Sequence, residues 1–112
     1  MVKCIYMVEK YSLYEEKVEE AKKILLELIE NWRKASKLMV ELLEKTKKIE
    51  EFLKRNPPNA ETLKKLNELY LAQIERLEKE ISHLLAVINS LLDYIERLKI
   101  LDSLTDYPAG HA

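Results

Sequence analysis

Hydrophobic residues recur through the second half of the chain with the spacing of a coiled-coil helix. Isoleucine and leucine alternate there at intervals of three and four residues: Ile74, Leu77, Ile81, Leu84, Ile88, Leu91, Ile95 and Leu98. Such residues occupy the a and d positions of a heptad, the buried stripe of a helix packed lengthwise against other helices. The pattern predicts a helix over residues 60–104, with Asn59 as its N-cap.

The first half of the chain carries a second line of the same kind. Its a and d positions are Tyr14, Val18, Ala21, Leu25, Leu28, Trp32, Ala35, Met39, Leu42, Thr46, Ile49 and Leu53. Ser12 precedes this line and Glu15 follows three residues later, the arrangement in which each side chain satisfies a free backbone N–H at a helix start. A helix over residues 12–55 is therefore predicted.

Pro57 and Pro58 separate the two lines, because a proline ring provides no N–H and disfavours helical geometry in the residue before it. Residues 56–59 are predicted as a turn, and a connection this short makes the two helices antiparallel neighbours. The expected fold is all-α, an antiparallel hairpin of two long helices in a single domain over residues 1–112.

The two ends of the chain lie outside the heptad pattern. Residues 1–11 are apolar without clean alternation, so they form either a short strand or an irregular arm that covers apolar surface. Residues 105–112 are expected to be a flexible tail.

Positions beside the a and d stripe are also apolar, which a lone hairpin leaves in water. On the second helix they are Leu66, Leu71, Leu85, Val87, Leu92, Tyr94 and Leu101, and on the first Ile24, Ile29, Leu38, Leu43 and Phe52. Burying one such side chain is worth about 1.5–3 kcal/mol. We therefore expect the hairpin to associate with a second copy as a four-helix bundle, or with another helical protein. The seven positions on the second helix are the predicted oligomer interface.

Charge is distributed unevenly, although the net charge is only −1. Residues 45–65, the hairpin tip, hold seven Lys or Arg against three Glu, whereas residues 1–30 with 93–112 hold seven against eleven Asp or Glu. Antiparallel hairpins would place each positive tip beside the partner's negative end. The predicted homodimer is thus antiparallel and resembles the small plasmid protein Rop in architecture.

Composition narrows the setting of the protein. Charged residues make up 35% of the chain, and their Lys and Glu richness resembles that of thermophile proteins. Cys4 is the only cysteine, which excludes an internal disulfide or a multi-cysteine zinc site and suits a reducing compartment. With neither a signal-peptide pattern nor an apolar run of about 20 residues, we expect a soluble cytoplasmic protein and no membrane partner.

Two polar residues interrupt the a lines, Thr46 and Asn67. They are predicted to lie at neighbouring levels of the hairpin, with Tyr70 and Gln73 close by. One interpretation is a polar pocket in the bundle. The favoured one is a hydrogen-bonded layer that determines the register of the helices.

Two spacings on the second helix match known sites. Glu80 and His83 have the Glu-x-x-His spacing of di-metal helical bundles, but they fall on the flank and on the outer surface, and no inward carboxylate faces them. Arg76 and His83 are separated by six residues, which resembles the Arg–His pair of HEPN ribonucleases; that resemblance implies RNA cleavage at a dimer cleft. Both residues occupy the outward c position, where a charged surface accounts for them. No catalytic residue, cofactor or metal ligand is therefore assigned.

The tip carries the best candidate for nucleic-acid contact, through Lys45, Lys47, Lys48, Lys54, Arg55, Lys64 and Lys65. Glu50, Glu51 and Glu61 are interleaved with these cations, as on an ordinary solvated helix surface. The sequence favours a non-enzymatic interaction or assembly protein. A nucleic-acid-associated protein, either a Rop-like RNA binder or a filament or coat subunit, is the alternative, and a small helical nuclease or metal-binding bundle is more remote.

Overall fold

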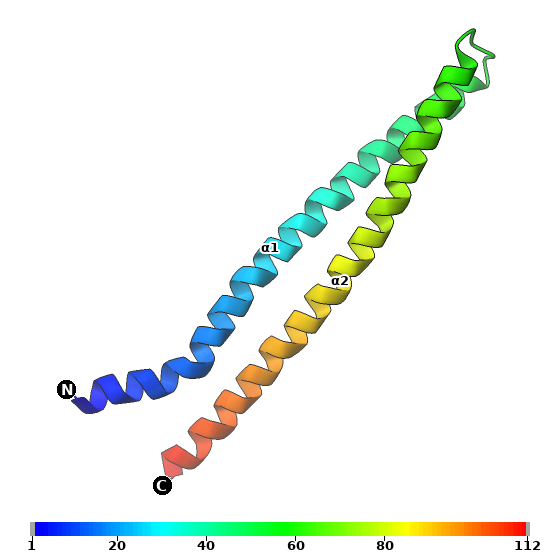
Figure 1. The fold of residues 1–112 in the computed structure, drawn as a ribbon. Helices are drawn as coiled ribbons and strands as arrows, with labels where there is room; N and C mark the ends of the chain where they lie inside the picture. The colour runs from blue at the N-terminus through cyan, green and yellow to red at the C-terminus, as the bar shows by residue number, and fades with distance from the viewer. Residues whose placement is uncertain (1, 112) are drawn as a thin grey trace. The chain divides into compact units, whose positions relative to one another are not determined.

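The computed structural model shows two long α-helices joined by a short turn (Figure 1). It describes the backbone of residues 2–111 and the side chains of residues 14–104. Helix α1 spans Val2–Leu53 and helix α2 spans Ala60–His111. Over the described backbone there is no strand, so the predicted all-α helical hairpin is confirmed.

The outer helix ends differ from the predicted ones. Helix α1 begins at Val2, so residues 2–11, expected to be part of a strand or an irregular arm, are helical, and Ser12 lies inside α1 instead of capping it. Residues 2–11 contain neither Gly nor Pro, and each residue added to an existing helix gains a hydrogen bond without a new nucleation cost. Helix α2 likewise continues to His111, through most of the predicted tail at 105–112.

The turn is built as the Asn-Pro-Pro-Asn sequence predicts. The N–H groups of Arg55 and Asn56 donate to the carbonyls of Phe52 and Leu53 at 3.0 and 3.1 Å, which tightens the end of α1. Asn56 then adopts a φ of 51°, a left-handed conformation that asparagine tolerates better than most residues. The Asn59 carbonyl accepts the Leu63 N–H at 3.1 Å, as the residue preceding a helix does.

The chain forms two compact units. Unit 1 comprises Met1–Ile29 with Ala86–Ala112, and unit 2 comprises Glu30–Leu85, which includes the turn. In unit 1 the buried cluster consists of Val18, Ala21, Ile95 and Leu98, with Tyr14, Leu25 and Leu91 packed against it. These residues come from both helices, so each helix covers the apolar stripe of the other within this unit.

Unit 2 has a core of the same kind. Ala35, Leu42 and Ile74 are buried, and other a and d positions are half-buried, among them Trp32, Met39, Ile49, Leu77, Ile81 and Leu84. On both helices the described side chains at the outward b, c and f positions of the heptad are exposed. The a and d assignment made from the sequence is therefore confirmed in both units.

Candidate interaction surfaces

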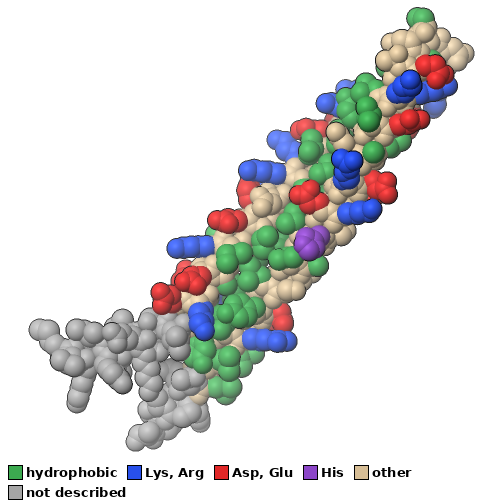
Figure 2. All heavy atoms as spheres, viewed as in Figure 1, with side chains coloured by type: hydrophobic (Ala, Val, Ile, Leu, Met, Phe, Trp, Pro, Cys, Tyr) green, Lys and Arg blue, Asp and Glu red, His purple; other side chains and the backbone are tan. Residues whose placement is uncertain are grey.

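Two apolar flanks border the core stripe. The e flank consists of the heptad e positions Ile29, Leu43, Leu71, Leu85 and Leu92, and the g flank consists of Ile24, Leu38, Phe52, Leu66, Val87, Tyr94 and Leu101. All of these except Ile29 are exposed. Figure 2 shows such hydrophobic side chains at the surface, bordered by charged ones. These side chains are therefore exposed in the single chain, as the sequence predicted for a lone hairpin.

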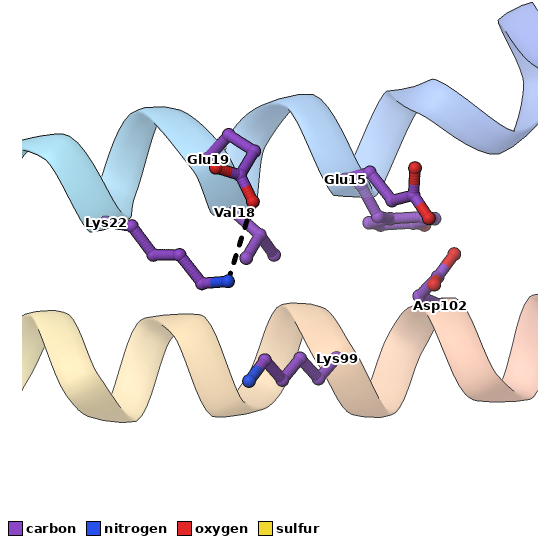
Figure 3. A pocket seen from close by; sticks show the side chains of 7 residues that line it. Glu15, Val18, Glu19, Lys22, Lys99 and Asp102 are labelled. Atoms are coloured by element: carbon purple, nitrogen blue, oxygen red, sulfur yellow. Dashed lines mark hydrogen bonds and ion pairs between the residues drawn. The ribbon is translucent and has the colours of Figure 1, made fainter.

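In unit 1 the e flank ends among charged side chains. Leu92 is 47% exposed there. Glu15, Lys22 and Lys99 occupy the next e positions and line an open hollow of about 380 Å³ with Tyr14, Val18, Glu19 and Asp102. In Figure 3, Glu15 of α1 and Asp102 of α2 point toward one another, and Lys22 reaches Glu19 with Nζ 3.5 Å from the carboxylate. This charged border resembles the polar rim that surrounds an apolar interface.

In unit 2 the e positions alternate between large apolar side chains and small or charged ones. Leu43, Leu71 and Leu85 are 45, 46 and 41% exposed, respectively. Ser36, the e position between Ile29 and Leu43 on α1, is half-buried, and Glu78, the e position between Leu71 and Leu85 on α2, is exposed. The flank therefore has a small side chain near its middle on one helix and a carboxylate on the other.

The g flank of unit 2 is hollowed. A depression of about 270 Å³ is lined by Asn31, Lys34, Ala35, Leu38, Leu77 and Glu80. Because Ala35 and Leu38 of α1 line it together with Leu77 and Glu80 of α2, residues 35–38 lie level with residues 77–80. This side thus combines amide, cation, carboxylate and apolar side chains, whereas the e positions at the same level are Ser36 and Glu78.

The seven basic side chains of the tip are all exposed. Lys64 lies 3.5 Å from the Glu61 carboxylate, and Lys45 Nζ lies 5.7 Å from the centre of the Tyr70 ring. Lys47 and Lys48 share a shallow hollow with Glu44 and Glu51. The tip thus presents its cations together with nearby carboxylates, which reduce the local positive potential.

The polar core residues do not form the predicted layer. The Thr46 hydroxyl donates to the Leu43 carbonyl at 2.8 Å, within its own helix. Asn67 Oδ1 is buried and accepts no hydrogen bond, and Trp32 Nε1 is buried without an acceptor. A threonine inside a helix has a carbonyl of the preceding turn within reach, and this local bond competes with bonds across the hairpin.

The two spacings noted on α2 involve residues on its surface. Arg76, Glu80 and His83 are all exposed. Among the side chains the structure describes, no group of three or more His, Cys, Asp or Glu is placed to hold a metal ion.

Comparison with known protein families, curated proteins and solved structures finds no match to this chain. Neither helix, over the residues described, combines the length and apolarity needed to cross a bilayer.

Two features of the surface were not singled out by sequence reasoning. Asp102 continues the a line seven residues beyond Ile95 and is half-buried, which its heptad position predicts in retrospect. Ser36 is half-buried although it occupies an e position beside the stripe. Sequence reasoning considered only large apolar side chains at these positions and therefore did not single it out.

Proposed function

We propose that this chain is a non-enzymatic interaction or assembly protein that acts through the surfaces of a helical bundle. Its partner is a second copy of itself, arranged as an antiparallel homodimer of hairpins. The proposal includes a cytoplasmic setting, because a chain with a single cysteine suits a reducing compartment.

The observation that carries the proposal is the exposure of the two flanks. Eleven large apolar side chains beside the core stripe are between 36 and 51% exposed in a single chain. Leaving that surface wet forfeits on the order of 10 kcal/mol, comparable with the whole stability of a small domain. Association with a second hairpin covers one of these flanks, which recovers part of that free energy, and widens the two-helix core into a four-helix one.

Charge supports a second copy as the partner and an antiparallel arrangement. The tip has an excess of four positive charges and residues 1–30 with 93–112 an excess of four negative ones. A head-to-tail pair brings opposite signs together at both ends, whereas a parallel pair brings like signs together.

The test is light scattering coupled to size exclusion over a wide concentration series. We expect a species of twice the 13.2 kDa chain mass, retained when the protein is diluted to low micromolar concentration. Helicity measured by circular dichroism on the same samples shows that the chain remains folded. A helical monomer at every concentration would overturn the homodimer.

A second candidate function is nucleic-acid binding through the tip. It is favoured by the exposure of all seven basic residues there, which leaves their ammonium and guanidinium groups accessible to phosphates. Binding of a labelled RNA or DNA should weaken steeply with salt and be lost in the triple variant Lys47→Glu, Lys48→Glu, Arg55→Glu. Affinity unchanged by these substitutions would place any binding elsewhere on the chain.

A further inference from the structure

We propose that one side of the hairpin tip binds single-stranded nucleic acid, with phosphates on Lys48 and Arg55 and a base stacked on the ring of Phe52. This inference rests on the second candidate function, nucleic-acid binding through the tip, and specifies the side of the tip and the class of strand. It is independent of the homodimer. The residues that carry it all lie in unit 2.

Three cations and one aromatic ring follow a single line along α1 and its end. Lys45, Lys48, Phe52 and Arg55, here called the tip stripe, are separated by three, four and three residues, the spacing of one helix face. The Arg55 N–H donates to the Phe52 carbonyl at 3.0 Å. In a turn with this 3₁₀ bond, residues three apart lie one above the other. Lys45 Nζ lies 5.7 Å from the centre of the Tyr70 ring, so this cation is engaged with α2.

The two sides of the tip differ in charge. Over residues 45–69, all of which the structure describes, the charged residues at g and c positions are the three cations of the tip stripe, and the α2 positions Thr62, Leu66 and Leu69 are uncharged. On the b and e side, Lys47 and Lys54 flank Glu50, and Lys64 lies 3.5 Å from the Glu61 carboxylate. Division by side therefore separates a purely basic face from a mixed one, which the net charge of the tip conceals.

Lys48 and Arg55 are available to an anionic ligand. Both are exposed, and among the side chains that the structure describes neither forms an ion pair. Glu44 and Glu51 line a shallow hollow with Lys48, but they lie at f positions on the outer surface. Cations that are exposed and free of a carboxylate partner can contact phosphates without first breaking an ion pair.

The ring of Phe52 is 46% exposed and borders an apolar position of α2. Leu38 and Glu80, both at g, line one depression, and two heptads nearer to the turn the corresponding g positions are Phe52 and Leu66. Leu66 is 37% exposed, so it extends the apolar surface beside the ring. Proteins that bind single strands combine such accessible rings, on which bases stack, with cations that follow the backbone.

The spacing of the tip stripe favours a single strand. Seven residues separate Lys48 from Arg55, about 10 Å at the helical rise. A stacked strand advances about 3.4 Å per nucleotide, so phosphates about three nucleotides apart reach both cations while a base between them meets the ring. In a duplex, neighbouring bases already cover each base face, which leaves the ring without a partner. A membrane surface instead favours a helix that is apolar along a whole face, which the tip stripe is not.

Binding to labelled oligonucleotides tests the side of the tip. Fluorescence anisotropy of the full chain is measured with oligo(dT) and oligo(U) of about 15 nucleotides, and with a DNA duplex of the same length, over a salt series. Lys48→Gln with Arg55→Gln removes two charges from the tip stripe, and Lys47→Gln with Lys54→Gln removes the same charge from the opposite side. Each phosphate contact to a single strand contributes about 0.7 to the slope of log affinity against log salt. We expect the first pair of substitutions to reduce that slope by about 1.4 and the second by less than half as much.

Two substitutions of Phe52 test stacking. Phe52→Leu keeps an apolar side chain but removes the ring, and it should weaken binding of the single strands at least about fivefold. Phe52→Tyr keeps the ring and should bind within about twofold of the natural chain. Circular dichroism of each variant shows that the hairpin is folded. A contact that depends on apolarity alone would be retained in Phe52→Leu, which would overturn the stacking role.

The remaining outcomes separate this inference from the function on which it rests. Failure of the natural chain to bind any of the oligonucleotides overturns both. Binding that the two pairs of lysine and arginine substitutions weaken equally retains nucleic-acid binding but overturns the tip stripe as its site. A duplex bound as tightly as the single strands overturns the class of strand. Binding to phosphatidylserine vesicles but not to oligonucleotides overturns the inference in favour of a membrane surface.

Discussion

At the scale of single residues, the buried polar atoms of unit 2 are the clearest departure from a simple apolar core. Thr46 is satisfied by the Leu43 carbonyl, whereas Asn67 Oδ1 lies buried with no donor. An unsatisfied buried acceptor costs about 1–3 kcal/mol relative to one that keeps a partner. Asn67 therefore lowers the stability of the chain in which it lies.

Asn67→Leu should raise the free energy of unfolding by about 1 kcal/mol, because the substitution removes the unpaired amide and adds an apolar side chain at an a position. Thermal or denaturant unfolding at fixed protein concentration measures the change. Asn89→Leu is the matched control, because Asn89 lies on the exposed b position, and it should change stability by less than about 0.5 kcal/mol. A loss of stability in Asn67→Leu would mean that the amide is hydrogen-bonded in solution.

The hydrogen bonds of the polar core residues could not be predicted from the sequence. Heptad position predicted that Thr46 and Asn67 lie in the core, and both do. It did not predict their hydrogen bonds, because the Thr46 hydroxyl had a carbonyl acceptor in its own helix as well as acceptors across the hairpin. The pattern assigns each residue to a face, but it does not decide between neighbouring hydrogen-bond partners.

At the scale of elements, the a and d positions supply the packing between the helices. The four ion pairs described in this chain join residues three or four apart within one helix, and their side chains are about half exposed or more. Exposed pairs of this kind add only about 0.3–0.5 kcal/mol each and do not connect the two helices. Burial of residues such as Ile95 therefore holds α1 against α2 in unit 1.

Ile95→Ala should lower the free energy of unfolding by about 2–5 kcal/mol, since Ile95 is only 6% exposed and its loss leaves a cavity. Ile100→Ala is the control on the same helix. Ile100 is 54% exposed, so its truncation should cost less than about 0.5 kcal/mol. Urea unfolding followed by circular dichroism gives both values. Equal effects of the two substitutions would contradict the core assignment.

The helices and the turn followed from the sequence because they depend on repeated, local features. The Ile and Leu spacing and the paired prolines each predict one conformation, and α2 begins at Ala60 as expected. The outer ends were predicted less well because several residue types there permit either outcome. Ser12 is a good N-cap, but it also fits inside a helix that already extends from Val2.

At the scale of the whole molecule, the orientation of the proposed dimer depends on how charge is distributed along the chain. The tip holds seven basic and three acidic residues, so Lys47→Glu with Lys48→Glu brings its net charge to zero. In an antiparallel dimer this change removes an attraction between the tip and the partner's acidic end. In a parallel dimer it would relieve a repulsion between two tips, so the orientation determines the sign of the effect.

The double variant should therefore weaken the dimer, raising its dissociation constant by about three- to tenfold at low ionic strength. At 1 M salt the Debye length is only about 3 Å, and the variant and the natural chain should dimerise alike. Lys34→Glu with Lys37→Glu is the matched control for total charge. These residues lie on α1 between residues 1–30 and the tip, so their substitution changes the total charge without changing the charge of either end. Analytical ultracentrifugation at both salt concentrations measures the constants, and a tighter dimer in the tip variant would establish the parallel orientation instead.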